Sequence, residues 1–260
     1  MKLSVYLVGV DPSPGGLALA GAFGGVSLAS WLLLLAGPLF FFVGIVGASL
    51  WLSVRGVDPA DIAERVPQSM SWILLVVLGS LGVLFVAVRP VEFGAIWTLS
   101  GFTVLDVGVG AVLGLLLGVA YLSVLAPLLA WVQATAGDYV PPGSVLSTVS
   151  GDAPAFFVAN VLLAPVVEET LYRGWALPLL AGQFGAAPGV ALSCLLFGLL
   201  HWPGGVWYVL LTGALAGGLF SGLFLWSGSI WAPFAAHLAL NLVEFASVWR
   251  DSDTATSLAV

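Results

Sequence analysis

Two adjacent carboxylates and an arginine lie inside a long apolar stretch of this chain, where Glu168 and Glu169 are followed by Arg173. Ionisable side chains at membrane depth are costly, so each of them is a candidate functional residue. Residues four apart are neighbours on a helix, so Glu169 can pair with Arg173. Glu168 is rotated by roughly 100° on the same helix and can face a cavity. The spacing therefore predicts different surroundings for the two carboxylates, with Glu168 available to accept or donate a proton.

The only two histidines also lie in apolar stretches, and each belongs to a pair of residues four apart. Phe197 precedes His201, and Asn241 follows His237. His237 and Asn241 share one helix face, where their side chains could stabilise a developing oxyanion. Each feature also has a structural interpretation, as an ion pair, a hydrogen-bonded core histidine or a polar contact between helices. The combination of all four features favours chemistry inside a bilayer.

The composition predicts a membrane protein. Of the 260 residues, 60% are hydrophobic and 7% are charged, whereas soluble domains have roughly a quarter charged residues. Within the apolar stretches, hydrophobic residues follow one another without alternating with polar ones, which indicates helices and not a β-barrel. We expect an all-α fold, a polytopic bundle of about eight transmembrane helices in the cell membrane. The net charge of -7 and the single lysine argue against a nucleic-acid partner.

A membrane span needs about 20 apolar residues, and this length divides the chain into eight candidates. Gly37-Pro38 interrupts the first apolar stretch, which predicts a tight hairpin of two spans. One tilted span with an interfacial helix is the alternative. Pro165 is expected to bend its helix one turn before Glu168. The predicted spans are 17–36, 38–54, 71–88, 105–132, 154–181, 186–202, 206–226 and 229–249.

Eight spans would place both termini on one side of the membrane, and the distribution of basic residues predicts that this side is the cytoplasm. We expect a single membrane domain, 1–260, with the chemistry in 154–249 and spans without evident chemistry in 1–153. The predicted cytoplasmic side carries Lys2, Arg55, Arg65 and Arg250, and the other side carries Arg89.

Other intramembrane protease classes lack their motifs here. The chain contains no His-Glu-x-x-His of a zinc protease, no Gly-x-Gly-Asp of an aspartyl protease and no Gly-x-Ser-Gly of a rhomboid-like serine protease. Two Glu and two His could ligate zinc or iron. Arg173 already supplies positive charge beside them, and we expect no metal and no cofactor.

Three motifs in order resemble the CPBP family, which comprises CAAX prenyl proteases and bacteriocin-processing (Abi) proteins. They are Glu-Glu-x-x-x-Arg at 168–173, Phe-x-x-x-His at 197–201 and His-x-x-x-Asn at 237–241. The flanking sequences Tyr-Arg-Gly-Trp at 172–175 and Gly-Ser-Ile-Trp-Ala-Pro at 228–233 are also similar. The resemblance covers about residues 154–241.

The resemblance implies a membrane endopeptidase of the metal-independent glutamic type. Glu168 would activate a water molecule, which His201 would help to hold and polarise. His237 and Asn241 would stabilise the tetrahedral oxyanion. The residues that would shape the site are Glu169, Arg173 and Phe197.

The substrate would be a peptide or a membrane protein, prenylated or unprenylated, reached within the lipid bilayer. Two alternatives stay open. In a proton-coupled transporter, Glu168 and the histidines would relay protons, and an immunity-type or scaffold membrane protein would keep the fold without turnover. Asn241 distinguishes the protease hypothesis from the transporter hypothesis, because hydrolysis needs an oxyanion donor whereas proton transfer does not.

Overall fold

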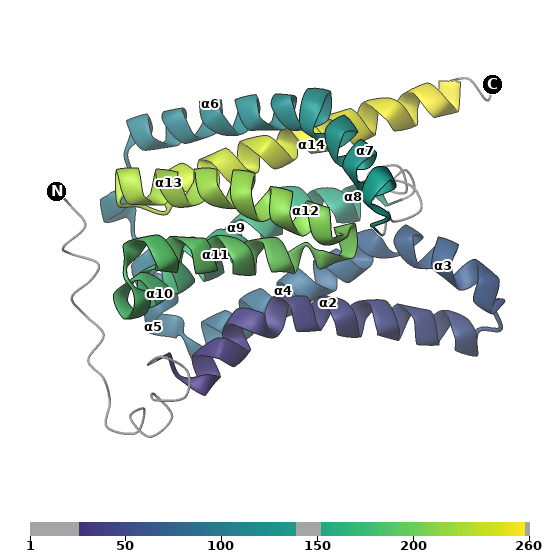
Figure 1. Ribbon diagram of the computed structural model, residues 1–260, viewed down its shortest axis with the longest axis horizontal. Coiled ribbons are helices and arrows are strands. Elements are labelled where there is room, and N and C mark those ends of the chain that lie inside the picture. The colour runs from purple at the N-terminus through teal and green to yellow at the C-terminus, as the bar shows by residue number, and fades with distance from the viewer. Residues whose placement is uncertain (1–25, 139–151, 258–260) are drawn as a thin grey trace.

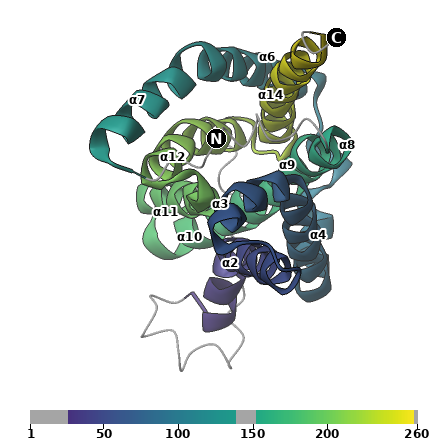
Figure 2. The same ribbon diagram turned by 90° about the vertical axis from the view of Figure 1, so that its right-hand side faces the viewer.

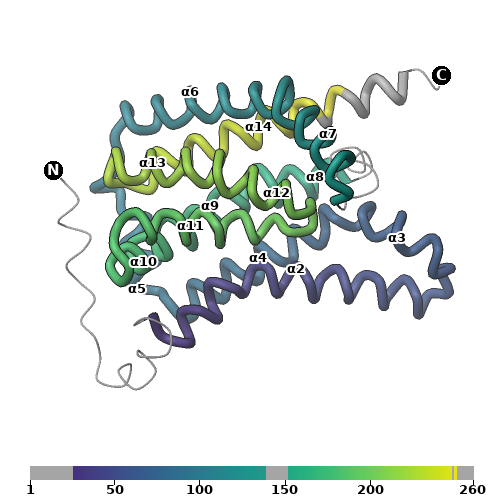
Figure 3. The backbone as a smooth tube through the Cα atoms, viewed as in Figure 1, coloured from purple at the N-terminus to yellow at the C-terminus, as the bar shows by residue number. Residues whose placement is uncertain are grey.

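The computed structural model describes residues 26–138 and 152–257, and every regular element within them is a helix. Long helices lie side by side along the longest axis of the molecule, and successive ones run in opposite directions (Figures 1 and 3). The expected all-α bundle is thereby confirmed. Five helical segments are long and apolar enough to cross a membrane, so the predicted number of about eight is not confirmed.

Thirteen labelled α-helices, four π-helical turns and two 3-10 turns, Leu99–Gly101 and Trp202–Gly204, make up the bundle in the described residues. The α-helices are α2 (Leu28–Val54), α3 (Pro59–Gln68), α4 (Met70–Val88), α5 (Pro90–Ile96), α6 (Val104–Ala120), α7 (Ala126–Ala136), α8 (Ala153–Phe156), α9 (Ala164–Glu168), α10 (Leu177–Phe184), α11 (Ala186–Leu200), α12 (Val206–Leu211), α13 (Gly218–Ser227) and α14 (Trp231–Ser257). The π-helical turns are η2 (Tyr121–Leu125), η4 (Phe157–Leu163), η5 (Glu169–Ala176) and η7 (Thr212–Gly217).

The π-helical turns join shorter helices into continuous segments. The five candidate spans are Leu28–Val54, Met70–Val88, Val104–Ala136, Ala153–Phe184 and Val206–Ser227. Helix α11 is apolar but shorter, and α14 carries the C-terminal end of the site. Seven long segments therefore form the bundle that the described residues build.

The predicted hairpin at Gly37-Pro38 is wrong, because α2 continues through both residues. Proline removes one helical hydrogen bond, but within membranes neighbouring helices can satisfy the freed backbone groups. Here the indole of Trp202 donates a hydrogen bond to the carbonyl of Pro38 over 3.3 Å. The carbonyl that Pro38 leaves without its helical partner is that of Leu34, so the bond from Trp202 does not replace the lost one, but it anchors α2 at Pro38 from a distant segment. Residues 17–25 of the first predicted span lie outside the described part of the chain.

The basic residues divide between the two ends of the bundle. Arg55, Arg65 and Arg250 belong to the end of α2, α3 and the end of α14, which lie at one end, whereas Arg89 precedes α5 at the other (Figure 1). This division matches the predicted one, and the assignment of the arginine-rich end to the cytoplasm stays a prediction. The predicted shared side of the two termini depends on residues 1–25, which the structure does not describe.

Helix α14 rests directly on α6, and the two helices lie side by side in both ribbon views (Figures 1 and 2). A Cβ atom at Gly110 would overlap the backbone carbonyl of Ala232, and one at Gly114 would overlap that of Ala236. The glycines therefore permit backbone-to-backbone contact, as the spacing of small residues suggested. Because α14 carries His237 and Asn241, this contact fixes the position of both residues relative to α6.

Replacement of Gly114 by alanine is expected to lower the free energy of unfolding by about 1–3 kcal/mol, because the new methyl group must push α14 away. The matched control is Gly108→Ala on the same helix, where a Cβ would meet nothing within 4 Å. Thermal unfolding in detergent would compare the two variants with the wild type. Equal stability of both variants would contradict the close packing of α6 on α14.

The segment Ala153–Phe184 that carries the carboxylate pair is irregular on both sides of Glu168. The π-helical turn η4 ends just before Pro165, and η5 begins at Glu169. Proline cannot donate a backbone hydrogen bond, and a wider turn next to it accommodates that loss. π-Helical turns of this kind often occur at functional sites.

Candidate active site

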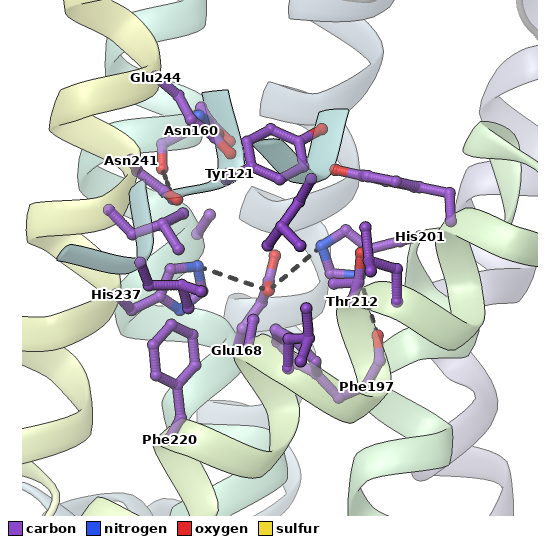
Figure 4. Close-up of a pocket in the computed structure, with 18 residues that line it drawn as sticks. Tyr121, Asn160, Glu168, Phe197, His201, Thr212, Phe220, His237, Asn241 and Glu244 are labelled. Atoms are coloured by element: carbon purple, nitrogen blue, oxygen red, sulfur yellow. Dashed lines mark hydrogen bonds and ion pairs between the residues drawn. The ribbon is translucent and has the colours of Figure 1, made fainter. Parts of the chain in front are cut away.

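A cavity of about 100 Å³ lies between α6–η2, η4–α9, α11, α12–η7 and α14. Each helix faces it with residues one turn apart, as with Asn160, Ala164 and Glu168 along one helix. Figure 4 shows the polar side chains converging from these helices. Its polar lining consists of Tyr121, Asn160, Glu168, His201, Tyr208, Thr212, His237, Asn241 and Glu244.

Glu168 occupies the middle of this cavity, between the two histidines. Its side-chain oxygen Oε2 lies 4.0 Å from Nε2 of His201 and 4.0 Å from Nε2 of His237 (Figure 4). Both distances exceed a direct hydrogen bond, and this oxygen has no hydrogen-bond partner among the described residues. Glu168 is 3% exposed. Of the sequence-predicted residues, His201 and His237 are thus brought together around one oxygen of Glu168.

The other ring nitrogen of each histidine is held by an acceptor. Nδ1 of His201 lies 2.9 Å from the carbonyl oxygen of Phe197, and Nδ1 of His237 lies 2.8 Å from Oε1 of Glu169. A carbonyl oxygen only accepts, so Nδ1 of His201 carries the proton. The carboxylate of Glu169 favours the same arrangement at His237. Both Nε2 atoms therefore point toward Glu168.

Glu169 and Arg173 form a fully buried ion pair. The guanidinium donates to Oε1 of Glu169 over 3.1 Å and to the carbonyl of Gly217 over 3.2 Å. It also lies 4.0 Å from the ring centroid of Phe197. Since Oε1 of Glu169 contacts His237 as well, this pair orients the histidine from behind and does not itself line the cavity.

Asn241 and His237 lie side by side on α14. The amide nitrogen of Asn241 donates to the backbone carbonyl of Asn160 over 2.6 Å. An amide group has two N–H donors, so this bond fixes the side chain and leaves a second donor for the cavity. The ring of His237 stacks on Phe220, with the centroids 4.8 Å apart.

The sequence interpretation missed several cavity residues, including Asn160, Tyr208 and Phe220. The signal for Asn160 was present, because it is a polar residue eight positions before Glu168 on an otherwise apolar helix. Tyr121 was missed because its helix showed no other chemistry. Its presence shows that the region 1–153 contributes to the cavity wall together with 154–249.

No group of three or more His, Cys, Asp or Glu side chains in the described ranges 26–138 and 152–257 has the arrangement of a metal site. The reactive groups of the site are the carboxylate of Glu168 and the imidazoles of His201 and His237. The buried pair Glu169–Arg173 lies behind them. Such a set can accept a proton, hold a water molecule and donate hydrogen bonds to an anion.

Comparison with known proteins gives one result. A family model described as "Type II CAAX prenyl endopeptidase Rce1-like" matches residues 150–243. This region contains Glu168, Glu169, His201, His237 and Asn241, and it ends one residue before Glu244. Neither the comparison with curated proteins nor that with solved structures gives a match.

Proposed function

We propose that this multi-pass membrane protein is a glutamate-dependent, metal-independent intramembrane endopeptidase, because the family model described as "Type II CAAX prenyl endopeptidase Rce1-like" matches residues 150–243. The observation that carries the proposal is the position of one Glu168 oxygen, 4.0 Å from Nε2 of both His201 and His237 in a buried cavity. The substrate is a peptide or a membrane protein.

In the proposed reaction, a water molecule enters between Glu168 and His201. Glu168 takes a proton from the water, and the oxygen of the water attacks the carbonyl carbon of the cleaved peptide bond. The tetrahedral intermediate then breaks its C–N bond, and Glu168 returns the proton to the departing amine. His201 acts as an acceptor through Nε2, because Nδ1 already donates to the carbonyl of Phe197.

The oxyanion of the intermediate is assigned to His237 and Asn241. A protonated His237 donates through Nε2 while Nδ1 remains bound to Glu169. Asn241 supplies its second amide N–H.

Replacement of Asn241 by alanine is expected to lower kcat about 100- to 1,000-fold with little change in KM, because the donor acts on charge that develops only in the transition state. Steady-state cleavage by purified variant and wild type, at matched thermal stability, measures this effect. An unchanged kcat would remove Asn241 from the reaction and weaken the hydrolytic assignment.

The test of the function is cleavage by purified protein in detergent. Two substrates are offered, a quenched prenylated peptide ending in a CaaX sequence and a pool of unprenylated membrane peptides. The wild type is compared with Glu168→Ala, each with and without a chelator. Glu168-dependent cleavage that persists in chelator supports the proposal, whereas no cleavage of either substrate by folded wild type counts against it.

A further inference from the structure

The cavity contains a second carboxylate, Glu244, which the proposed reaction does not use. It lies on α14 seven residues after His237, about 10 Å farther along the helix axis. Its side chain lines the same cavity as that of Asn160. Figure 4 shows Glu244 and Asn160 together, on the side of Asn241 away from His237.

Two tyrosines accompany Glu244 in this part of the cavity. Tyr121 from η2 and Tyr208 from α12 line the same cavity. Figure 4 places the ring of Tyr121 next to Asn160. Aromatic faces and a carboxylate both attract cations, and the attraction is stronger where water is excluded.

The charges of the cavity favour the same kind of ligand. None of the described residues that line it is a lysine or an arginine, whereas two of them, Glu168 and Glu244, are carboxylic acids. The nearby guanidinium of Arg173 is fully buried and is bound to Glu169 and to the carbonyl of Gly217. A free carboxylate of a substrate would therefore find no lysine or arginine side chain in the cavity wall.

We propose that Glu244, Tyr121 and Tyr208 form a specificity subsite for a cationic side chain of the substrate, within about three residues of the cleaved bond. The limit follows from the distance of about 10 Å, because an extended chain advances by about 3.3–3.6 Å per residue. The same subsite disfavours a free C-terminal carboxylate at that distance. The role in specificity rests on the proposed endopeptidase function, but binding at the subsite requires no turnover.

The consequence is a substrate preference that differs from the family description. A peptide with a lysine or arginine near the cleaved bond is favoured over one with an acidic residue there. A chain that continues beyond this point, or that ends in an amide, is favoured over one that ends in a free carboxylate, as the last residue of a CaaX sequence does.

The test is a binding measurement that does not depend on cleavage. The protein carries Glu168→Gln so that bound peptides stay intact. The probes are fluorescent 12-residue peptides of leucine and alanine, in which one Lys, Gln or Glu is placed in turn at each of the six central positions. At the best position the lysine peptide is expected to bind about tenfold more tightly than the glutamate peptide.

In the Glu244→Gln background this ratio is expected to fall to about one, and in Glu244→Lys to reverse. The matched control is Glu64→Gln, which changes an exposed acid on α3 and should leave the ratio unchanged. Thermal unfolding of each variant establishes that it is folded. A purely structural role of Glu244 would alter stability without altering the ratio between the two peptides.

Three results would overturn the proposal. They are equal binding of the lysine and glutamate peptides by protein with Glu244 intact, a lysine preference that persists in Glu244→Gln, and no binding of any probe. Failure of the proposed endopeptidase function appears separately, as absence of Glu168-dependent cleavage. A lysine preference that depends on Glu244 in a protein without cleavage would therefore reject the reaction but keep the subsite.

Discussion

Replacement of Glu168 by glutamine is expected to lower peptide cleavage about 100- to 10,000-fold while the protein remains folded. Glutamine has the same shape but cannot accept a proton from water. Oε2 of Glu168 has no direct hydrogen-bond partner among the described residues, so no close contact is lost. Removal of a buried carboxylate also relieves a desolvation cost. The measurements are the initial rate of cleavage and the temperature of unfolding in the same detergent.

The control for this variant is Glu64→Gln, the same chemical change at an exposed position on α3. It should retain the wild-type rate. Glu168→Ala serves as a second variant, because it removes the side chain instead of altering its charge. Retention of more than a tenth of the wild-type rate in both Glu168 variants would exclude this residue as the base.

Replacement of Arg173 by methionine is expected to lower the free energy of unfolding by about 3–5 kcal/mol, the usual cost of stranding one partner of a buried ion pair. The guanidinium is completely buried and holds Glu169 at 3.1 Å. Without it, Glu169 keeps only the contact with His237. Thermal unfolding in detergent, compared with the wild type, measures the loss.

The double variant Glu169→Gln, Arg173→Met provides the control. It removes both charges, so it should recover a large part of the stability that the single variant loses. The expected contrast is with Glu168→Ala, which should stay near wild-type stability. Equal thermal stability of Glu168→Ala and Arg173→Met would contradict the division between a reactive carboxylate and a structural one.

The parts of the site that could be predicted from the sequence are those set by spacing along one helix. The relation of Glu169 to Arg173, and of His237 to Asn241, follows from a separation of four residues. Polar residues in apolar stretches also marked Glu168 as the centre. These features are local, and tertiary packing did not change them.

The parts that could not be predicted depend on contacts between distant segments. Helix α2 is anchored at Pro38 by Trp202, which lies 164 residues later in the chain. Asn241 is fixed by the carbonyl of Asn160, which is 81 residues away. The glycines of α6 indicated close approach of some helix, but nothing in their spacing identified α14 as the partner.

The direct contact between α6 and α14 links the geometry of the site to the thickness of the surrounding lipid. Leu115, Leu116 and Val119 on α6 are exposed on the outer surface, while Gly110 and Gly114 rest on the backbone of α14. A helix that meets a thinner or thicker bilayer adjusts by tilting. Because no side chain separates the two backbones at these glycines, a tilt of α6 moves α14 with it. The position of His237 and Asn241 relative to Glu168 thereby becomes sensitive to the length of the lipid chains.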